Sequence, residues 1–516
     1  MNKESQAAHT GVRRIVLLAL LYSIALSWAL NSRYTVLNLD LWWHLNTGAW
    51  IVHHHAVPAT DPFSQAGADK PWVAYSWLFD LTLYGCYRWL GLLGTLLYTL
   101  TILIGIAMAL HRAIRTRLEG FVGPIALAAA GLFAMASLYS ARPWLFSVLF
   151  YIVELDIVLA ALAEVPVEAH VNVQDDRARR RLWLLPLLFA VWANLHIQFI
   201  YGLALLVLAA LTQNLDIAIG PQGASVVRAR NRLGPTLWAV TGASFLATLL
   251  NPYSWRVYAV ILGLAVQPAP YRLVTELTPP TFRFPVEYLI VLIAMAGAFA
   301  LGRATLRYRV FAALLLCGVT LAYLHLARDG WLLVVTALLL IADASRKSAP
   351  AVESLPRLQQ IAGLAAATLL IFAMAKAKGV SNAHLEDEVA SYYPVKAADV
   401  VSQQSLSGPL FNDFNWGGYL MWRLPQFRVA MDGRTNVYGD ERIERSTDTW
   451  NCLGDWKTDP DLRAANLVIG ESGACLSSAL ASDPAYQLVY RDPISVVFIR
   501  RAPDNNAKVP AGHGGF

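Results

Sequence analysis

Charged residues are scarce in this chain, which argues against a soluble globular protein. Asp, Glu, Lys and Arg make up only 15% of the 516 residues, whereas 56% are hydrophobic. Soluble domains usually carry about 25% charged residues. Tracts that combine clustered Lys and Arg with aromatic residues are also missing, so we expect no nucleic-acid partner. Present instead are repeated long apolar runs, which predict a polytopic α-helical membrane protein in contact with the lipid bilayer.

A cleavage site for a signal peptidase is missing after the first apolar run, Ile15 to Leu30. The run follows a polar segment that ends in Arg13 and Arg14, as in a secretory signal peptide. However, the next residues, NSRYTVLNLD, lack the small residues of an A-x-A site. We therefore expect a retained first membrane span, and a cleaved signal peptide is the alternative.

Cysteine is rare as well, and the four cysteines fall in two environments. Cys86 and Cys317 lie in apolar surroundings, which is typical of unreactive core residues. Cys452 and Cys475 lie in the polar C-terminal region. They could form a disulfide bond if that region is exported to an oxidising compartment.

Basic loops determine the predicted topology. Alternate pairs of apolar runs are separated by five basic segments: HRAIRTR, RARRR, VVRARNR, RATLRYR and DASRK. The positive-inside rule places these segments in the cytoplasm, which gives about eleven spans, a cytoplasmic N-terminus and an extracytoplasmic C-terminus. The predicted spans are residues 15–31, 92–110, 122–140, 143–163, 183–196, 198–212, 235–251, 287–302, 310–325, 330–343 and 361–377.

The run from Arg181 to Leu211 lies between two basic loops and must therefore cross the membrane twice. WANLHIQF would break the run and place Asn194 and His196 at the outer end of two short helices. Short spans often face a water-filled cavity, so we expect both residues to line one. A single kinked helix is the alternative, and it would invert the topology of everything downstream.

The predicted membrane domain, residues 1–378, includes a long first external loop, and a polar C-terminal region follows it. The first external loop, residues 32–91, contains the amphipathic stretch YSWLFDLTLYGCYRWLG, which is too short to cross and should lie along the interface. Residues 379–500 predict a small extracytoplasmic α/β domain, and residues 501–516 predict a disordered tail. The expected strands are GPLFNDF, GGYLMWRL, FRVAMDGR, ANLVIGES and a hairpin in QLVYRDPISVVFIRR, with helices at 394–405 and 474–482.

Asp40 follows the first span closely and would lie at the outer membrane surface. A carboxylate there suits a general base that deprotonates an acceptor hydroxyl. His44, four positions later on a helix, would share its face and could tune Asp40 or bind phosphate when protonated. The alternative is that Asp40 only caps an interfacial helix beginning at Leu41.

Arginines near the outer surface are candidates for binding a phosphate group, because one guanidinium can bind two oxygens at once. The arginines that qualify by topology are Arg142, Arg256, Arg272 and Arg328. Each could instead anchor its helix at the interface. Glu276, in TELTPP, is a second external acid that could assist or bind a metal. The intramembrane acids Glu154 and Asp156 should each face a partner or a cavity, since burial of a charge in a membrane is costly.

The order of these features resembles the C-type glycosyltransferase fold, in which a first span is followed by a long outer loop that begins with an acid. This superfamily includes protein mannosyltransferases, aminoarabinose transferases and oligosaccharyltransferases. The resemblance implies that a sugar moves from a polyprenyl-phosphate carrier on the outer face, with the catalytic acid at the place of Asp40. Many members carry paired acids there, whereas Asp40 stands alone in LDLWWHL.

Several motifs resemble more closely a bacterial family of membrane proteins with glycosyltransferase-like architecture. They are DLWWHLNTGAWI, ARPWLFS, WANLH, NPYSW and NWGGYLMWRLP. This resemblance implies a multi-pass protein of the bacterial inner membrane. It also implies an envelope acceptor, which could be a lipid, a glycan or a protein.

The stretch DFNWGGYLMWRLPQFRVAMDGRT is similar to the start of the soluble domain in oligosaccharyltransferases, where a Trp-Trp-Asp-Tyr-Gly motif grips the acceptor. Trp416 and Tyr419 occupy a comparable place, but the acidic member is missing. Asp432 and Arg434 form a turn in the same stretch, and an outward Arg434 could contact the carrier phosphate. The alternative is a tight Gly-Gly turn that leads into a strand.

The histidine-rich segment leaves metal binding open. Along a strand His53 and His55 would share a face, and with His44 and Asp61 they could form a zinc site. We predict no metal ligand from this incomplete pattern, and a divalent cation stays an option for the reaction. The leading function is an inverting glycosyltransferase. The alternatives are a lipid or polysaccharide transporter or flippase, which short broken helices would favour, and a non-catalytic partner in envelope assembly.

Overall fold

The computed structural model describes residues 3–30, 35–68, 70–163, 175–219, 224–345 and 357–501. The chain forms two units. Unit 1 comprises Met1–Pro58 and Val73–Glu388, and unit 2 comprises Ala59–Trp72 and Val389–Phe516. The segment Ala59–Trp72, which sequence analysis assigns to the first external loop, therefore belongs with the C-terminal domain. The predicted disordered tail lies, except for Arg501, outside the described residues.

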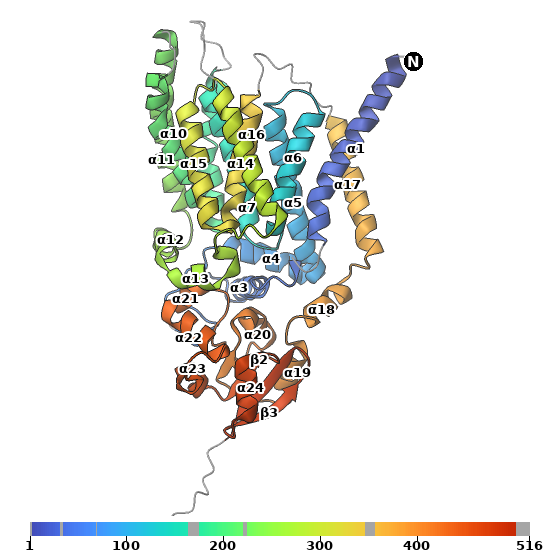
Figure 1. Cartoon of the computed structure of the whole chain (residues 1–516), viewed down its shortest axis with the longest axis vertical. Helices are drawn as coiled ribbons and strands as arrows, with labels where there is room; N and C mark the ends of the chain where they lie inside the picture. The colour runs from blue at the N-terminus through green and yellow to red at the C-terminus, as the bar shows by residue number, and fades with distance from the viewer. Residues whose placement is uncertain are drawn as a thin grey trace, which may run out of the picture. The chain divides into compact units, whose positions relative to one another are not determined.

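Unit 1 is a bundle of long helices (Figure 1). Each of the eleven predicted spans falls on one of these helices. Among the described residues, four helices are long and apolar enough to cross a membrane, namely α5, α7, α14 and α17, so the number of spans stays a prediction. The helices are α1 (Lys3–Ala29), α5 (Leu92–Arg115), α6 (Val122–Ala134), α7 (Trp144–Ala163), α9 (Leu185–Leu195), α10 (Phe199–Ile219), α11 (Ala224–Thr248), α14 (Pro285–Arg303), α15 (Arg309–His325), α16 (Gly330–Ala344) and α17 (Arg357–Ala377).

Helix α16 is the core of this bundle, because nearly all its residues from Trp331 to Ala342 are buried. Small residues let its neighbours approach closely, as is common between membrane helices. A Cβ atom at Gly297 of α14 would lie 3.1 Å from the Cβ atom of Ala337. A Cβ atom at Gly131 of α6 would lie only 2.3 Å from Leu338. The tight packing fixes the segments that connect these helices.

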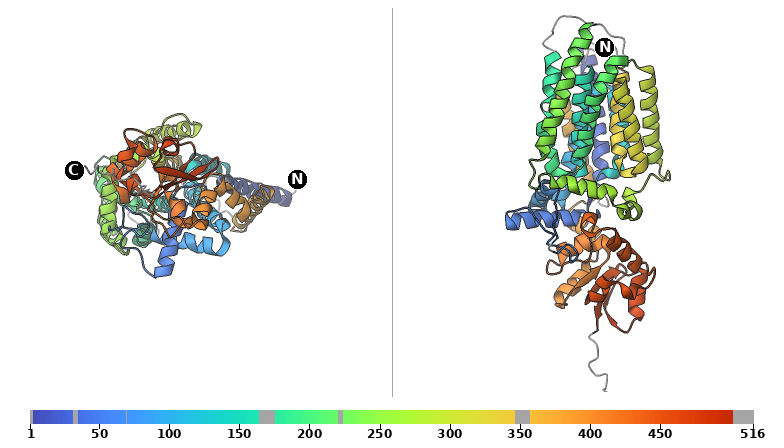
Figure 2. Two further views of the ribbon diagram at one scale, coloured as in Figure 1. Left: turned by 90° about the horizontal axis from the view of Figure 1, so that it is seen from below. Right: turned by 90° about the vertical axis from the view of Figure 1, so that its left-hand side faces the viewer.

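Short helices gather at one end of the bundle (Figures 1 and 2). They are α3 (Leu41–His54), α4 (Trp77–Leu90), α12 (Arg256–Val266) and α13 (Pro268–Leu273), with the 3-10 helices η2 (Thr275–Leu277) and η3 (Ala327–Asp329). Helices α3 and α4 cross closely at Gly48, where a Cβ atom would lie 2.2 Å from the carbonyl oxygen of Asp80. The prediction of a helix within residues 75–91 is confirmed, and Trp89 is 86% exposed on it.

The run from Arg181 to Leu211 contains two separate helices rather than one kinked helix. Helix α9 ends at Leu195 and α10 begins at Phe199, with His196 in extended conformation between them. Asn194 accepts a hydrogen bond from the Trp77 indole of α4 (2.8 Å). This contact places the break at the end of the bundle where the short helices gather.

The opposite ends of α5, α7 and α16 are joined by ion pairs. Arg117 pairs with Asp156, and its Nε atom lies 3.1 Å from Oδ1 of Asp343. The prediction that Asp156 faces a partner is therefore confirmed. Glu154 differs, because it is fully buried and, among the described residues, its carboxyl oxygens have no hydrogen-bond partner.

Unit 2 contains a four-stranded sheet in the order β1-β2-β4-β3. Strand β1 (Leu410–Asn412) is parallel to β2 (Leu467–Glu471), whereas β4 (Ser495–Arg500) is antiparallel to β2 and to β3 (Tyr486–Arg491). The helices are α18 (Asn382–Ala390) at the boundary between the units, α19 (Val395–Gln403), η4 (Phe414–Trp416), α20 (Gly417–Arg423), α21 (Thr435–Tyr438), α22 (Asp440–Trp450), η5 (Trp456–Thr458), α23 (Pro460–Ala464) and α24 (Cys475–Ser482). In unit 1, α8 (Asp175–Leu182) precedes α9.

The predicted strands GPLFNDF and ANLVIGES, the hairpin and both predicted helices of unit 2 are confirmed. Two strand predictions are wrong, since GGYLMWRL forms α20 and FRVAMDGR forms no strand. A short apolar run does not distinguish a strand from a buried helix by its periodicity. Tertiary packing rather than periodicity sets the structure of this stretch. The start of α20 packs closely against the segment at Met431, since a Cβ atom at Gly417 would lie 1.9 Å from the carbonyl oxygen of Met431.

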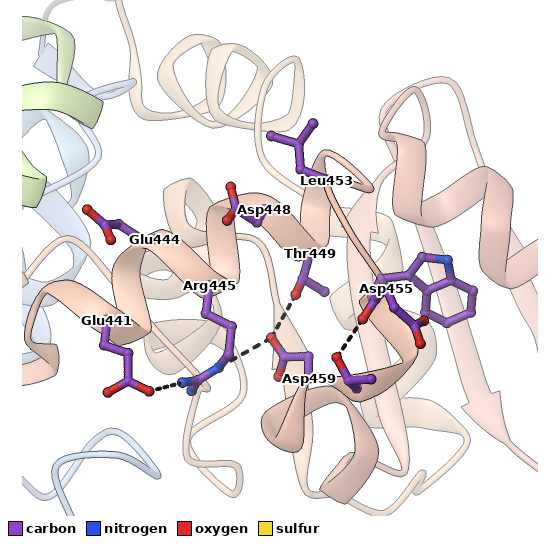
Figure 3. Close-up of a pocket in the computed structure, with 10 residues that line it drawn as sticks. Glu441, Glu444, Arg445, Asp448, Thr449, Leu453, Asp455 and Asp459 are labelled. Carbon is purple, nitrogen blue, oxygen red and sulfur yellow. Dashed lines mark hydrogen bonds and ion pairs between the residues drawn. The ribbon is translucent and has the colours of Figure 1, made fainter.

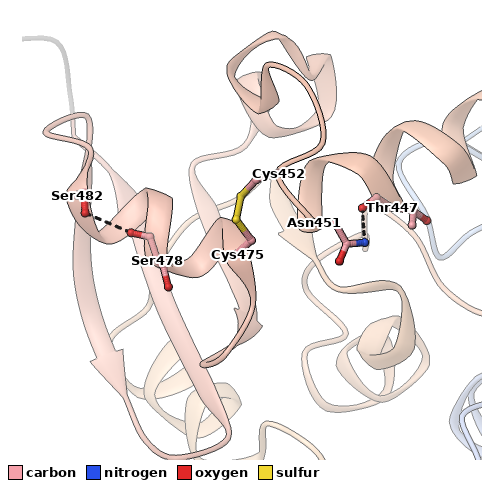
Figure 4. The surroundings of a disulfide bond; sticks show 6 residues. All are labelled: Thr447, Asn451, Cys452, Cys475, Ser478 and Ser482. Carbon is pink, nitrogen blue, oxygen red and sulfur yellow. Dashed lines mark hydrogen bonds between the residues drawn. A yellow bond between two sulfur atoms is a disulfide. The ribbon is translucent and has the colours of Figure 1, made fainter.

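Cys452 and Cys475 form a disulfide bond, as the sequence suggested (Figure 4). It joins the end of α22 to the start of α24. The prediction that the other two cysteines are core residues is wrong for Cys317, which is exposed on α15, and Cys86 is half-buried. Apolar surroundings in the sequence do not imply burial in a membrane protein, because apolar side chains also face lipid.

Candidate functional site

Asp40 stands at the N-terminal end of α3, but its side chain does not cap the helix. The helix begins at Leu41, as expected, and the Asp40 side chain accepts no capping hydrogen bond. The backbone N–H of Asp40 donates instead to Oδ1 of Asn38 (2.9 Å). The capping alternative is therefore wrong, and the carboxylate is left to face other groups.

Four charged residues meet around this carboxylate, and we call them the Asp40 cluster: Asp40, Arg142, Glu276 and Arg328. The Nη1 atom of Arg142 lies 3.2 Å from Oδ2 of Asp40 and 2.6 Å from Oε1 of Glu276. The Nη1 atom of Arg328 lies 3.6 Å from the same Glu276 oxygen. The Nε atom of Arg142 donates to Oδ1 of Asn38 (2.9 Å). Segments before α3 and α7 and within η2 and η3 thus converge on one point.

Trp144 supports both arginines of the cluster. Its ring lies 4.6 Å from the guanidinium carbon of Arg142 and 5.8 Å from that of Arg328. Cation–π contact of this kind holds a guanidinium in place. The Arg142 side chain is only 10% exposed, whereas Asp40 and Glu276 are 21% and 35% exposed. The two carboxylates are therefore still within reach of a ligand or of water.

The environment separates the two acids of the cluster. Burial raises the pKa of Asp40; Arg142 opposes this effect and Glu276 reinforces it, so the pKa stays above its usual value. Burial also acts to raise the pKa of Glu276, but Arg142 and Arg328 more than offset it and the pKa is lowered. Glu276 therefore ionises more readily than a free glutamate, whereas Asp40 holds a proton more strongly than a free aspartate.

His44 pairs with an acid that sequence analysis did not single out. Its Nδ1 atom lies 2.5 Å from Oδ1 of Asp80, in the first turn of α4, and both side chains are buried. Burial and the nearby Arg142 and His196 hold the pKa of His44 well below its usual range. Burial and the lowered pKa disfavour the cationic form of His44, so phosphate binding by this ring stays a prediction. Asp80 is the single acid in α4, and this was the signal that could have identified it.

The cavity-lining candidates of α9 have protein partners. The His196 Nδ1 atom lies 2.9 Å from the Ser147 hydroxyl, and the His196 ring is 6.5 Å from that of Tyr75. The amide of Asn194 donates to the Leu250 carbonyl (3.2 Å), in addition to its contact with Trp77. These contacts connect α9 to its neighbours. Arg272 lies on the exposed last turn of α13, four residues before Glu276.

Tyr75 and Asp329 also belong to the surroundings of the cluster, although no sequence pattern marks them. Burial and the charge of Asp40 raise the pKa of Tyr75 to about 12, so the phenol stays protonated. Asp329, next to Arg328 in the chain, accepts a hydrogen bond from the Tyr201 hydroxyl (2.5 Å). Helix α10 thereby fixes the loop that carries Arg328.

In unit 2, Trp416 and Tyr419 are buried, and the Tyr419 ring stacks on Tyr393 with 4.8 Å between the centroids. The role of Trp416 and Tyr419 in acceptor binding stays a prediction. Their burial within unit 2 shows that both rings serve its packing.

Arg434 does not point outward, which corrects the expectation that it could contact a carrier phosphate. Its Nη1 atom lies 2.7 Å from Oδ1 of Asp61, and its Nη2 atom lies 2.7 Å from Oδ2 of Asp432. The guanidinium carbon is 4.6 Å from the Trp72 ring centroid. With two carboxylates and an aromatic face as partners, the side chain is only 1% exposed.

The histidine-based zinc site is not formed. Asp61 is occupied by Arg434 in unit 2, and His53 and His55 are exposed in unit 1. Within the part of the chain that the structure describes, no group of three or more His, Cys, Asp or Glu side chains could hold a metal ion.

Unit 2 also contains a cavity of about 320 Å³ that includes none of the predicted site residues (Figure 3). Arg445 lies 3.7 Å from Asp459 and 3.6 Å from Glu441 in its wall. The other acids of the wall are Glu444, Asp448 and Asp455. With five acids against one arginine, this cavity does not suit a phosphate group.

No protein-family model matches this chain, and no curated protein has a matching sequence. Solved structures do match. The archaeal oligosaccharyltransferase AglB from Archaeoglobus fulgidus, in complex with an inhibitory peptide and a dolichol-phosphate, is similar with a TM-score of 0.55 and 11% identity over 97% of this chain and 75% of that one. The Archaeoglobus fulgidus oligosaccharyltransferase tethered to an acceptor peptide with the NVT sequon has a TM-score of 0.52 and 10% identity, over 96% and 75% of the two chains.

A third structure, the Archaeoglobus fulgidus oligosaccharyltransferase in complex with Zn and sulfate, has a TM-score of 0.50 and 9% identity, over 94% of this chain and 73% of that one. At such low identity the similarity concerns the fold, and it extends through both units. The chain therefore has the fold of the C-type glycosyltransferase superfamily, as the order of its sequence features predicted.

Proposed function

We propose that this protein is a membrane glycosyltransferase. It moves a sugar from a polyprenyl-phosphate-linked donor to an envelope acceptor on the outer face of the membrane, with Asp40 as general base. The observation that carries the proposal is the Asp40 cluster, in which a carboxylate with a raised pKa lies 3.2 Å from an arginine. The fold supports it, because a similar structure is an oligosaccharyltransferase with a bound dolichol-phosphate, which is a polyprenyl phosphate.

The reaction is an inverting displacement. The hydroxyl oxygen of the acceptor attacks the anomeric carbon while Asp40 accepts the hydroxyl proton. At the same time the bond from the anomeric carbon to the phosphate oxygen breaks. The electron pair stays on the departing polyprenyl phosphate. Arg142 and Arg328 stabilise this negative charge, because guanidinium groups form charge-assisted hydrogen bonds with phosphate oxygens. No covalent intermediate between sugar and protein is needed.

The topology supports the same proposal. The basic loops would be cytoplasmic by the positive-inside rule, which leaves the Asp40 cluster and unit 2 outside. The disulfide between Cys452 and Cys475 agrees with this orientation, since disulfides persist in oxidising compartments. Recognition of a peptide sequon is not part of the proposal, because Trp416 is buried within unit 2. The acceptor class therefore stays open among lipid, glycan and protein.

The test is transfer of radiolabelled sugar from a polyprenyl-phosphate donor to extracted envelope material by the purified protein. We expect Asp40→Asn to lower the rate by about 10²–10⁴-fold, because the general base is lost. Glu119→Gln, which changes an exposed acid of unit 1, is the matched control and should leave the rate unchanged. Equal rates for wild type and Asp40→Asn would remove Asp40 from the mechanism. Flipping of a fluorescent polyprenyl lipid without sugar transfer would favour a transporter.

A further inference from the structure

The position of Arg142 resembles that of a metal ion. A single nitrogen, Nη1, contacts the carboxylates of both Asp40 and Glu276, at 3.2 and 2.6 Å. A divalent cation that bound both acids would need an oxygen of each at about 2.0–2.6 Å. Both acids that would bind such a cation are instead bound by one guanidinium nitrogen.

This guanidinium is fixed by other contacts. Its Nε atom donates to Asn38, its face lies over Trp144, and the side chain is only 10% exposed. Displacing Arg142 would break these contacts and leave its charge without partners in a largely buried position. A cation cannot take this place without moving the side chain.

The charges and the donor set lead to the same result. The formal charges of Asp40, Glu276, Arg142 and Arg328 already cancel. A divalent cation added there would stand beside two guanidinium groups, which repel it. No group of three or more His, Cys, Asp or Glu side chains among the described residues could hold a metal ion, so a cation at this place would have only Asp40, Glu276 and water as ligands. The residues present therefore do not fit a divalent cation.

We infer that the guanidinium of Arg142 replaces a divalent cation between Asp40 and Glu276, so that this site does not bind such a cation and sugar transfer does not require one. The inference rests on the proposed function of the Asp40 cluster and adds a role for Arg142. It holds the base in place and supplies the positive charge that a metal ion would otherwise bring to the donor phosphate.

Binding of Mn²⁺ to the purified full-length protein tests the inference without any assay of sugar transfer. Wild type is first stripped of metal and then titrated with Mn²⁺, with binding followed by electron paramagnetic resonance or calorimetry. It should show no Mn²⁺ site that depends on Glu276, so Glu276→Gln should give the same titration as wild type. Arg142→Ala should gain one site that binds Mn²⁺ at least tenfold more tightly than any residual binding by wild type. The double variant Arg142→Ala/Glu276→Gln should lose this site. Arg328→Ala is the matched control, because it keeps Arg142, and it should gain no site.

Two outcomes would overturn the inference. One is a Mn²⁺ site in wild type that Asp40→Asn or Glu276→Gln removes. The other is the absence of any gained site in folded Arg142→Ala, with folding checked by the thermal unfolding midpoint. If Arg142→Ala does not fold, Arg142→Gln takes its place, and the wild-type titration still decides the first outcome.

Chelation separates this inference from the proposed function. Transfer by wild type should be unchanged within twofold in excess EDTA, and a loss that Mn²⁺ or Mg²⁺ restores would also overturn the inference. If no sugar is transferred under any condition, the proposed function fails. The Mn²⁺ titration would nevertheless show whether the Arg142 guanidinium occupies a cation position.

Discussion

Two arginines, one in each unit, have almost the same immediate surroundings. Arg142 in unit 1 and Arg434 in unit 2 each contact two carboxylates, and each guanidinium carbon lies 4.6 Å from a tryptophan ring centroid. They differ in the state of the acids. Asp61 and Asp432 are fully buried, whereas the acids that Arg142 contacts are 21% and 35% exposed.

The partners of the acids explain the difference in role. Asp61 also accepts hydrogen bonds from the Ser64 hydroxyl and the Phe63 backbone, and Asp432 accepts one from the Tyr438 hydroxyl (2.5 Å). Around Arg434 every carboxylate oxygen has a protein donor, so the cluster stabilises unit 2 and binds the segment Ala59–Trp72 into it. The Asp40 cluster keeps accessible oxygens, which a reaction requires. An arginine–carboxylate cluster is thus structural where every carboxylate oxygen has a protein donor. It can take part in a reaction only where some of these oxygens stay accessible.

Removal of each arginine should separate the two roles most strongly. Arg434→Ala leaves two buried carboxylates without their counter-charge, so we expect the free energy of unfolding to fall by about 3–5 kcal/mol. Arg142→Ala should cost only about 1 kcal/mol, because its carboxylates can reach water. Denaturant unfolding of the purified protein measures both. Equal losses for the two variants would show that the comparison has no energetic basis.

The disulfide adds a second stabilising element that unit 2 has and the site does not need. It closes a loop with a sequence separation of 23, so replacement of both cysteines by serine should lower the free energy of unfolding by about 3 kcal/mol. Cys86→Ser/Cys317→Ser is the control and should change it little. Thermal unfolding with and without reductant gives the measurement. The prediction fails if the reductant has the same effect on both double variants.

A conservative change should distinguish the arginines by activity. Arg142→Lys keeps the charge but loses the planar fork that contacts Asn38, Asp40 and Glu276, so we expect the transfer rate to fall about tenfold, or about 1.4 kcal/mol. Arg434→Lys should lower stability and leave the rate of the folded protein nearly unchanged. Rates are normalised to the folded fraction. A larger rate loss in Arg434→Lys would reverse the assignment of roles.

The dependence on pH should show the smallest effect. The pKa of Asp40 is raised by burial, so the transfer rate should fall as the pH drops through a value above that of a free aspartate. Arg142 lowers this pKa, so Arg142→Gln should move the acidic limb to higher pH. A pH–rate profile of both proteins measures the shift, and a shift in the opposite direction would contradict the electrostatic argument.

Unit 2 provides the contrasting titration. Burial acts to raise the pKa of Asp61, but Arg434 more than offsets it and the pKa is lowered in the folded state. The stability from this pair is therefore present above the pKa of the unfolded chain and is lost as the pH falls through the folded value. Acid unfolding of unit 2 should begin at a lower pH than the loss of transfer.

The sequence identified the members of the Asp40 cluster but not their arrangement. Asp40, Arg142, Glu276 and Arg328 each lie beside an apolar run on the same predicted side, and topology alone therefore selected them. Topology selected Arg272 by the same rule, although it is exposed on α13. Asp80 was missed because His44 and Asp80 come together only when α3 crosses α4. Short-range patterns carry no information on such contacts.

The segment Ala59–Trp72 shows the same limit for domains. Nothing in its composition separates it from the rest of the first external loop. Its place in unit 2 depends on contacts with residues far along the chain, such as the bond of 2.7 Å from the Gln65 amide to the Leu410 carbonyl. Similarly, Arg434 lies in a stretch that reads as an exposed turn, and only its two acidic partners explain its burial.

The sequence by itself determined the positions of the long helices of unit 1 and the main strands of unit 2. Hydropathy and charge act locally and along the membrane normal, so they can be read from consecutive residues. The tertiary structure decided which acids and arginines pair, and which of the two arginine clusters is closed. Pairing and burial depend on the distance between segments that are remote in the chain, and that distance is set by packing.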